Sequence, residues 1–172
     1  RVFRWLLSFF LPNPGIFRFI AHLSKPLKLI SFILPSFFKN LLELMPFSLP
    51  KRKLPEQKNY ASKLEKKMAR VALLTGCVQR VISPEINEAT IRLLNRHGVE
   101  VTVIPEIICC GSLNHHLGKK DLAHKSFVRN INAWHNEYLK NGLDAIISNT
   151  SGCGTTLKDY EFIFRNDKEM KK

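Results

Sequence analysis

The sequence predicts an α/β fold: a small three-layer unit with a short parallel sheet, preceded by a helical, proline-interrupted N-terminal segment. Two observations support this. From Arg70 onward, short apolar runs alternate with stretches of helical spacing, in the order strand, helix, strand, helix, strand, helix. Such alternation favours parallel strands joined by right-handed crossovers. Residues 1–50 differ, because Phe, Leu and Ile dominate there and prolines divide them into short pieces.

The first fifty residues are expected to form short amphipathic helices. Glu43 is their only acidic residue, and basic residues are scattered among them. No apolar run reaches the ~18–20 residues that a membrane span needs. Two interpretations stay open: a basic, apolar surface lying on a membrane, or a helical connector packed against a neighbouring domain. The expected helices are residues 2–11, 14–23, 26–33 and 36–44.

Residues 51–69 are polar, charged and contain proline, which is typical of a linker. A short helix over 61–68 is expected within it. The charged run 166–172 closes the sequence. Because the chain starts with Arg1 rather than Met, we expect it to be a piece of a longer polypeptide.

Three strand–helix pairs are expected between residues 70 and 165. Ser83, Pro84 and Glu85 form a typical helix start, with a capping hydroxyl, a proline at the first helical position and an acid in the first turn. The expected strands are 71–74, 99–104 and 143–148. The expected helices lie between Ser83 and Gly98, over 120–140 with Trp134 in the core, and over 155–164.

Four cysteines are the candidate functional residues. Each lies in a glycine-flanked turn just after a strand-like run. Because parallel strands end at one edge of a sheet, we expect the four to meet at the carboxyl edge, where open α/β sheets bind ligands. Iron and zinc both prefer thiolates, so the predicted metal and cofactor ligands are Cys77, Cys109, Cys110 and Cys153. Two alternatives stay open: buried cysteines acting as small apolar residues, and a redox-active Cys109-Cys110 dithiol.

Charge and cysteine usage narrow the partners and the compartment. Lys and Arg number 27 against 14 Asp and Glu, giving a net charge of +13. Two interpretations stay open: the charge favours an acidic subunit or anionic lipid as a partner, or the sequence is a fragment that lacks its acidic portions. Nucleic acid is not expected, because the aromatic residues lie in apolar blocks rather than among basic ones. Four cysteines are too few for a disulfide-stapled secreted domain, and no signal peptide is evident, so a reducing cytoplasm is expected.

Several other residues near the expected cysteine edge have two interpretations. His115 and His116 are metal ligands or proton carriers, or else a polar helix start. Arg80 and Lys158 offset the charge of a cluster, or else lie solvated on the surface. The glycines at 152 and 154 do not complete a dinucleotide fingerprint, because position 157 is Leu. No Ser-His-acid set can be argued from the order of residues, so no catalytic residue is assigned.

The cysteine spacing Cys77-x31-Cys109-Cys110-Gly111-x41-Cys153 resembles the CCG cysteine-rich domain of heterodisulfide reductase and its relatives. The resemblance covers about residues 70–165. In that family the last element is Cys-x-x-Cys, whereas here Thr150 stands at its first position. The resemblance implies an iron–sulfur cluster. With four cysteines rather than five, a conventional [4Fe–4S] cluster or a zinc ion is favoured over the family's noncubane [4Fe–4S] cluster.

Longer motifs are similar to the iron–sulfur subunit of glycolate oxidase. They are Gly76-Cys77-Val78-Gln79-Arg80, Pro84-Glu85-Ile86-Asn87, His97-Gly98-Val99-Glu100-Val101, Cys109-Cys110-Gly111-Ser112-Leu113-Asn114 and Ser151-Gly152-Cys153-Gly154-Thr155-Thr156.

This resemblance implies the domain organisation and partners. Residues 1–50 would connect to a preceding ferredoxin-like domain, and 70–165 would be the first of two CCG copies. A flavin-containing partner protein, with FAD as its cofactor, would oxidise glycolate, and electrons would pass through iron–sulfur centres toward a membrane quinone. The chain is then part of an oxidoreductase without performing the substrate chemistry, and lies peripherally on the cytoplasmic face of the membrane. A zinc-holding docking module and a heterodisulfide-type thiol domain are the alternatives.

Overall fold

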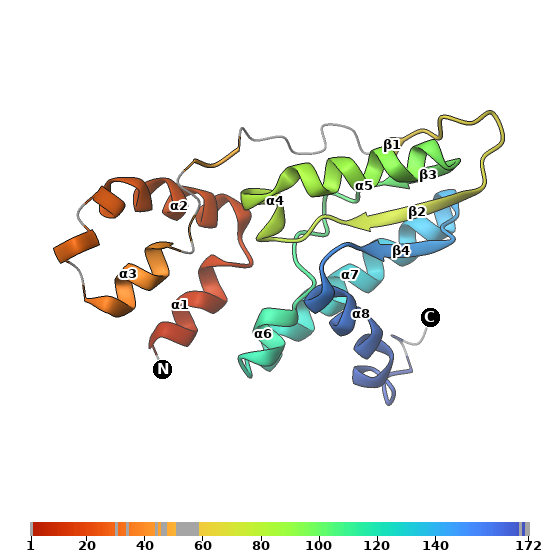
Figure 1. The fold of residues 1–172 in the computed structure, drawn as a ribbon. Helices are drawn as coiled ribbons and strands as arrows, with labels where there is room; N and C mark the ends of the chain where they lie inside the picture. Colours follow the sequence, from red (N-terminus) through yellow and green to blue (C-terminus); the bar gives the residue numbers. More distant parts are fainter. Residues whose placement is uncertain are drawn as a thin grey trace.

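A twisted sheet is at the centre of the fold (Figure 1). The computed structural model describes residues 2–29, 31–33, 35–43, 45, 48–50, 59–168 and 170. Within these residues the sheet has four strands in the order β1-β3-β2-β4. The strands are β1 (Asn59–Tyr60), β2 (Ala69–Leu74), β3 (Val99–Thr102) and β4 (Ala145–Ser148). Because β2 runs parallel to both β3 and β4, the predicted parallel sheet is confirmed.

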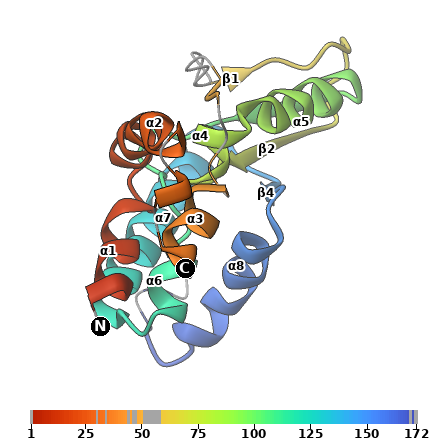
Figure 2. The same cartoon turned by 60° about the vertical axis from the view of Figure 1, so that its left-hand side comes forward.

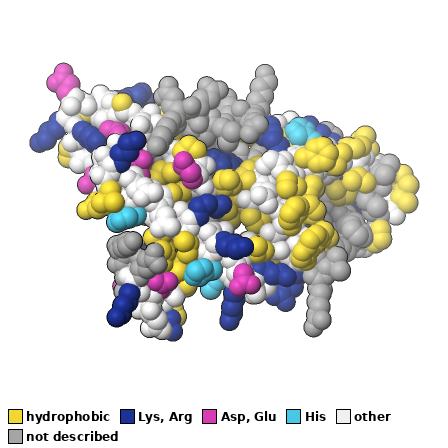
Figure 3. Space-filling view, turned by 180° about the vertical axis from the view of Figure 1, so that it is seen from behind, with side chains coloured by type: hydrophobic (Ala, Val, Ile, Leu, Met, Phe, Trp, Pro, Cys, Tyr) yellow, Lys and Arg dark blue, Asp and Glu magenta, His cyan; other side chains and the backbone are white. Residues whose placement is uncertain are grey.

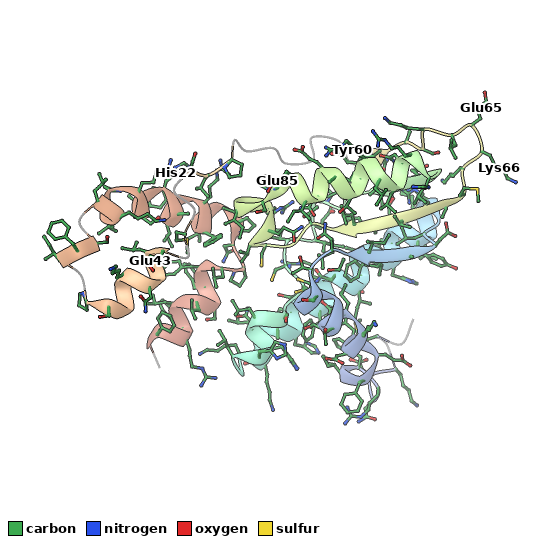
Figure 4. The ribbon with its side chains drawn as sticks, viewed as in Figure 1. His22, Glu43, Tyr60, Glu65, Lys66 and Glu85 are labelled. Carbon is green, nitrogen blue, oxygen red and sulfur yellow. The ribbon has the colours of Figure 1, made fainter. Side chains whose placement is uncertain are left out.

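The strand β1 was not predicted from the sequence. It pairs antiparallel with β3, at the edge away from β4. The short helix expected over 61–68 is wrong, because these residues form bends and irregular chain. Two of their backbone amides bond to the end of helix α5 (Pro84–Arg96) and the turn after it: Lys63 N donates to Asn95 O at 2.9 Å, and Met68 N donates to Gly98 O at 2.9 Å. Tyr60 lies on β1, and Glu65 and Lys66 lie at the tip of the loop to β2 (Figure 4).

Alternate residues of β2 supply two apolar layers, as the period of a strand requires. Val71 and Leu73 pack with Ile91 on the side of α5 (Pro84–Arg96). Ala72 and Leu74 face the other side, where Phe127 and Trp134 of α7 (Lys120–Asn141) and Tyr160 of α8 (Ser151–Ile163) cover the sheet. This gives the three layers expected from the sequence, with Trp134 in the core as predicted.

The helix α8 begins earlier than expected, at Ser151 rather than near residue 155. Gly152 and Gly154 therefore lie inside its first turn, and so does Cys153. The short helices α4 (Gln79–Ile82) and α6 (Ser112–His116) follow the other two cysteine turns. Each of the three cysteine-bearing segments thus leads directly into a helix.

The N-terminal segment forms α1 (Val2–Phe10), α2 (Pro14–Leu29), a 3-10 turn η1 (Ser31–Ile33) and α3 (Ser36–Glu43). The expected break before Pro26 is wrong, because α2 continues through this proline. Phe17, Ala21 and Ser24 share one buried face of α2, and their spacing keeps that face continuous. Phe17 and Ala21 pack against Val81 of α4, which joins the segment to the sheet domain. Figure 2 shows α1 running beside α6 and α7.

Candidate metal centre

Four cysteine sulfurs meet at the carboxyl edge of the sheet. Cys77 lies in the turn after β2, Cys109 and Cys110 lie in the loop after β3, and Cys153 follows β4. The Sγ atoms of Cys110 and Cys153 are 3.1 Å apart. The sulfur of Cys109 is a hydrogen-bond partner of both Cys77 and Cys110. The structure therefore brings together all four predicted ligands, although they are distant in sequence.

Backbone amides point at two of these sulfurs. Gly111 N donates to Cys109 Sγ at 3.4 Å, and Ser112 N donates to Cys110 Sγ at 3.5 Å. Gly111 has a φ of +85°, and a Cβ added to it would lie 2.5 Å from the Phe127 ring. Glycine is needed here because both its positive φ and the close approach of Phe127 exclude a side chain. The tight turn is what aims these two amides at sulfur.

The protons within the cluster are unequally shared. The pKa of Cys109 falls to about 3, because hydrogen bonds from the Cys110 and Cys77 thiols outweigh its burial. The Gly111 amide and the charge of Arg129 act in the same direction. The pKa values of Cys77 and Cys110 rise, chiefly because each holds its proton in a hydrogen bond to a neighbouring sulfur.

The pKa of Cys153 is lowered by the hydrogen bond from Cys110. The hydrogen bonds therefore favour the thiolate form at Cys109 and Cys153 and the thiol form at Cys77 and Cys110. Thiolate is the form that binds metals.

Cysteine side chains are suitable ligands for a thiolate-bound metal, but the sulfurs lie closer together than a bound metal requires. Within the described part of the chain, no three His, Cys, Asp or Glu side chains take up a metal-binding arrangement. Two thiolates on tetrahedral zinc, at about 2.3 Å each, would be roughly 3.8 Å apart. The 3.1 Å between Cys110 and Cys153 is shorter than that. These sulfurs would have to separate to accept either zinc or an iron–sulfur cluster.

A buried polar pair fixes the Cys109-Cys110 backbone from behind. Tyr160 donates its hydroxyl proton to Cys110 O at 2.6 Å, and Asn130 Nδ2 donates to Cys109 O at 2.9 Å. Asn130 Nδ2 also contacts the Tyr160 hydroxyl at 3.1 Å. Burial raises the pKa of Tyr160, so its hydroxyl stays protonated as a donor. Sequence reasoning missed both residues, because nothing in helical spacing marks them as different from other core positions.

A second polar network joins the Cys77 turn to the Cys153 turn. Gln79 Nε2 donates to Asn149 Oδ1 at 2.7 Å and to Asn87 Oδ1 at 3.0 Å. Thr150 Oγ1 donates to Gln79 Oε1 at 2.7 Å. Asn87 Nδ2 in turn donates to the carbonyl of Thr75, two residues before Cys77. Four side chains from three segments thereby fix the relative positions of two cysteine-bearing turns.

Comparison with known proteins identifies the family of the domain that contains the four cysteines. The CCG cysteine-rich domain matches residues 71–158, a span that contains all four cysteines. The chain belongs to the CCG cysteine-rich domain family. The expected resemblance is thus confirmed at the level of the domain. No solved structure matches the chain significantly.

Three proteins whose names describe subunits of oxidoreductases are similar to this chain. The glycolate oxidase iron-sulfur subunit of Escherichia coli is 38% identical over 98 residues, which are 57% of this chain and 24% of that protein. A probable glycolate oxidase iron-sulfur subunit of Bacillus subtilis is 30% identical over 138 residues, 80% of this chain and 30% of that protein. One of the subunits of fumarate reductase (CoM/CoB) from Methanothermobacter marburgensis is 37% identical over 93 residues, 54% of this chain and 18% of that protein. The chain therefore spans less than a third of the length of these relatives.

The other residues that the sequence singled out lie around the four cysteines rather than among them. His115 and His116 are exposed on α6, and the ring of His115 lies 5.8 Å from that of Phe127. Lys158 is exposed on α8, and Arg80 is half-buried on α4. The cation that lowers the pKa of Cys109 is Arg129 of α7, which sequence analysis did not single out. Its proximity depends on how α7 packs, and no local pattern reveals that.

Proposed function

We propose that this chain is part of an iron–sulfur subunit that transfers electrons within a glycolate-oxidising complex. The convergence of four cysteine sulfurs from three strand ends supports this proposal most directly. The names of the E. coli and B. subtilis relatives supply the substrate. The M. marburgensis relative is named as part of another oxidoreductase, a fumarate reductase, which agrees with electron transfer as the shared role.

Cys77, Cys109, Cys110 and Cys153 would hold the cluster, which we propose to be [4Fe–4S]. Such a cluster, when bound, supplies a one-electron carrier whose potential depends on charge, burial and hydrogen bonds to sulfur. This chain provides those influences: the amides of Gly111 and Ser112 contact two sulfurs. The polar network of Gln79, Asn87, Asn149 and Thr150 closes one side and keeps Cys77 near Cys153.

Oxidation of the substrate is assigned to a flavin-containing partner subunit with FAD as its cofactor. This chain has a thiol cluster that backbone amides contact, and we assign no glycolate-binding role to that cluster. A metal centre held by cysteines carries electrons, whereas removal of hydride from a hydroxy acid needs an organic cofactor such as a flavin. The division of labour follows from that chemistry and from the names of the relatives.

The N-terminal helices are proposed to lie on the cytoplasmic surface of the membrane, where electrons reach a quinone. Figure 3 shows hydrophobic side chains gathered over the end of the molecule that these helices form. Exposed apolar side chains and neighbouring basic residues together favour binding to anionic lipid. The exposed ones are Phe3, Trp5, Phe9, Phe19, Leu23, Leu27, Leu29, Phe32 and Ile33.

The length and composition of these helices set a limit on insertion. In the described residues no single helix is long and apolar enough to cross a membrane. Residues Phe3–Phe10 and Pro14–Leu29 pass that test only as a pair, with a bend of 115° between them. We therefore propose peripheral binding. Four free cysteines agree with a reducing compartment.

Zinc is the second candidate, because the closed sulfur spacing is nearer to a single ion than to a cluster. The test is anaerobic purification of the full-length protein followed by analysis of iron, acid-labile sulfide and zinc. Iron with sulfide, and an EPR signal on reduction, is expected. Stoichiometric zinc without a redox signal would replace the electron-transfer proposal with a structural role. Metal-free protein with thiol–disulfide turnover would favour the heterodisulfide-type alternative.

A matched pair of variants tests the ligand assignment. Cys153→Ser removes a proposed ligand, while Thr155→Ser changes an exposed residue two positions further along α8. Metal content should fall in the first variant and stay unchanged in the second. Unchanged metal content in Cys153→Ser would remove Cys153 from the site.

A further inference from the structure

A cavity of about 280 Å³ lies between α1 and the helices α6 and α7. Ligand pockets in proteins are typically ~300–1,000 Å³, so this cavity is at the small end and suits a small ring better than a dinucleotide. Side chains from four segments line it, and those used below are Trp5, Phe9, Cys109, Asn114, Lys125 and Arg129.

The wall on the α1 side is flat and aromatic. Trp5 and Phe9 are one helical turn apart, and their rings are stacked with centroids 5.9 Å apart and planes inclined by 4°. Trp5 is 55% exposed and Phe9 is 48% exposed, so neither ring is buried in the core. A planar conjugated ring packs favourably against such a surface.

The wall on the α7 side is cationic. Lys125 and Arg129 are also one turn apart, which places them on the same face of α7. No Asp or Glu lines the cavity among the described residues. The donors of these two side chains would therefore meet oxygen acceptors on a ligand rather than acids of the protein.

A buried acceptor completes the polar lining. Asn114 is 5% exposed, and its Oδ1 has no hydrogen-bond partner within the part of the chain that the structure describes. An unpaired buried oxygen of this kind costs free energy, which a hydroxyl or N–H donor on a ligand would recover. The cavity thus offers donors from α7 and an acceptor from α6.

We propose that this cavity binds the ring of a quinone. A quinone is planar and conjugated, its carbonyl oxygens accept hydrogen bonds, and the hydroxyls of the reduced form donate them. Lys125 and Arg129 suit the first state, and Asn114 suits the second. Cys109 lines the same cavity, so a bound ring lies beside the cysteine cluster. The inference rests on the proposed function, because it names the electron acceptor's site.

The first experiment is photolabelling of the full-length protein with an azido-quinone, followed by mass spectrometry. Crosslinks are expected in peptides containing residues 5–13, 108–109 or 114–129, which line the cavity, and a short-chain quinone should suppress them. Crosslinks elsewhere, or crosslinks that an excess of quinone does not suppress, would overturn the proposal. A hydroxybenzoate that competes as well as the quinone would instead show an aromatic carboxylate site and would also overturn it.

The second experiment compares two lysines on the same helix. Lys125→Leu removes a cation from the cavity, whereas Lys140→Leu removes one outside it. Quinone should compete roughly tenfold more weakly in the first variant, as expected for the loss of one charge-assisted hydrogen bond, and equally well in the second. Equal competition in both variants would overturn the proposal. If Lys125→Leu fails to fold, as judged by circular dichroism, Trp5→Leu on α1 takes its place with the same expected result.

Two further measurements keep this inference separate from the proposed function. Iron content and glycolate oxidation with an artificial dye both report the cluster and the flavin partner without a quinone. Labelling at the cavity in a protein without iron would contradict the proposed function but support the quinone site. Iron and dye activity without labelling would support the proposed function and contradict the quinone site.

Discussion

The hydroxyl of Tyr160 on α8 lies 2.6 Å from the backbone carbonyl of Cys110, the residue whose sulfur contacts Cys153 of the same helix. One helix therefore holds the Cys110 segment at two points, by its first turn and by its third. The side-chain oxygen fixes the backbone, and the sulfur contact fixes the side chain.

Tyr160→Phe should destabilise the protein without creating a large cavity in the core. The change removes one buried donor and leaves the Cys110 carbonyl unpaired, which costs about 1–3 kcal/mol of unfolding free energy. Urea denaturation of the metal-free protein measures this loss of unfolding free energy. Tyr138→Phe is the control, because Tyr138 is 56% exposed on α7 and should change stability little. Equal stability of both variants would show that the Cys110 carbonyl finds another donor.

Gly111→Ala should be more damaging than Gly118→Ala. Both glycines have a positive φ, +85° and +72°, so both substitutions impose backbone strain of about 1–2 kcal/mol. Only at Gly111 would the new Cβ meet the Phe127 ring, at 2.5 Å, whereas at Gly118 the nearest atom is Nη2 of Arg4 at 3.7 Å, an ordinary contact. The difference in denaturation midpoint between the two variants therefore measures the steric part. A difference of zero would mean that Phe127 moves aside freely.

Acid should weaken the ion pairs at the far end of the sheet. Arg70 contacts Glu100 Oε1 and Glu137 Oε1 at 2.6 Å each. Burial alone would raise the pKa of Glu100, but hydrogen bonds from Lys67 and Arg70 outweigh it and the pKa is lowered. A carboxyl with a lowered folded pKa stabilises the fold above its unfolded pKa, about 4.3. That contribution is lost as the pH falls through the folded value.

The pH dependence of unfolding for Glu100→Gln checks this sign. The variant should be less stable than the parent at neutral pH, and the gap should narrow as the pH falls below about 4.3. A constant gap at all pH values would mean that Glu100 acts by packing rather than by charge. Glu88→Gln is the comparison, because Glu88 forms a partly exposed pair with Arg92 at 3.7 Å.

Phe32→Glu should reduce binding to anionic vesicles, whereas Phe162→Glu should not. Both phenylalanines are exposed, at 80% and 66%, but Phe32 lies in the N-terminal segment and Phe162 on α8. Cosedimentation of the full-length protein with anionic liposomes measures it, and binding by the parent should weaken with added salt. Equal losses in the two variants would indicate a general charge effect rather than a membrane-binding face.

The sequence was sufficient to predict the parallel strands, because each is an apolar run followed by a glycine turn and a helix. It also predicted that the cysteines would meet, since parallel strands end at one edge. The strand β1 escaped prediction because it has two residues and depends on β3. The continuity of α2 through Pro26 escaped as well, because burial against α4 outweighed the local preference of proline.

The polar supports of the site were also beyond prediction. Gln79 and Asn149 are 70 positions apart, and Tyr160 and Cys110 are 50 apart. Their contacts depend on the packing of α8 and α4 against the sheet, which sequence spacing does not specify. The same is true of Arg129, whose effect on Cys109 requires α7 to lie over the loop after β3.

The edge strand β4 has a consequence for the durability of the cysteine cluster. Its first two residues are exposed, and Ile146 is 41% exposed, so fewer contacts hold it than hold β2. Fraying of this strand would carry Cys153 away while three sulfurs stayed in place. Loss or exchange of a bound metal should therefore start at Cys153, the ligand that follows an edge strand.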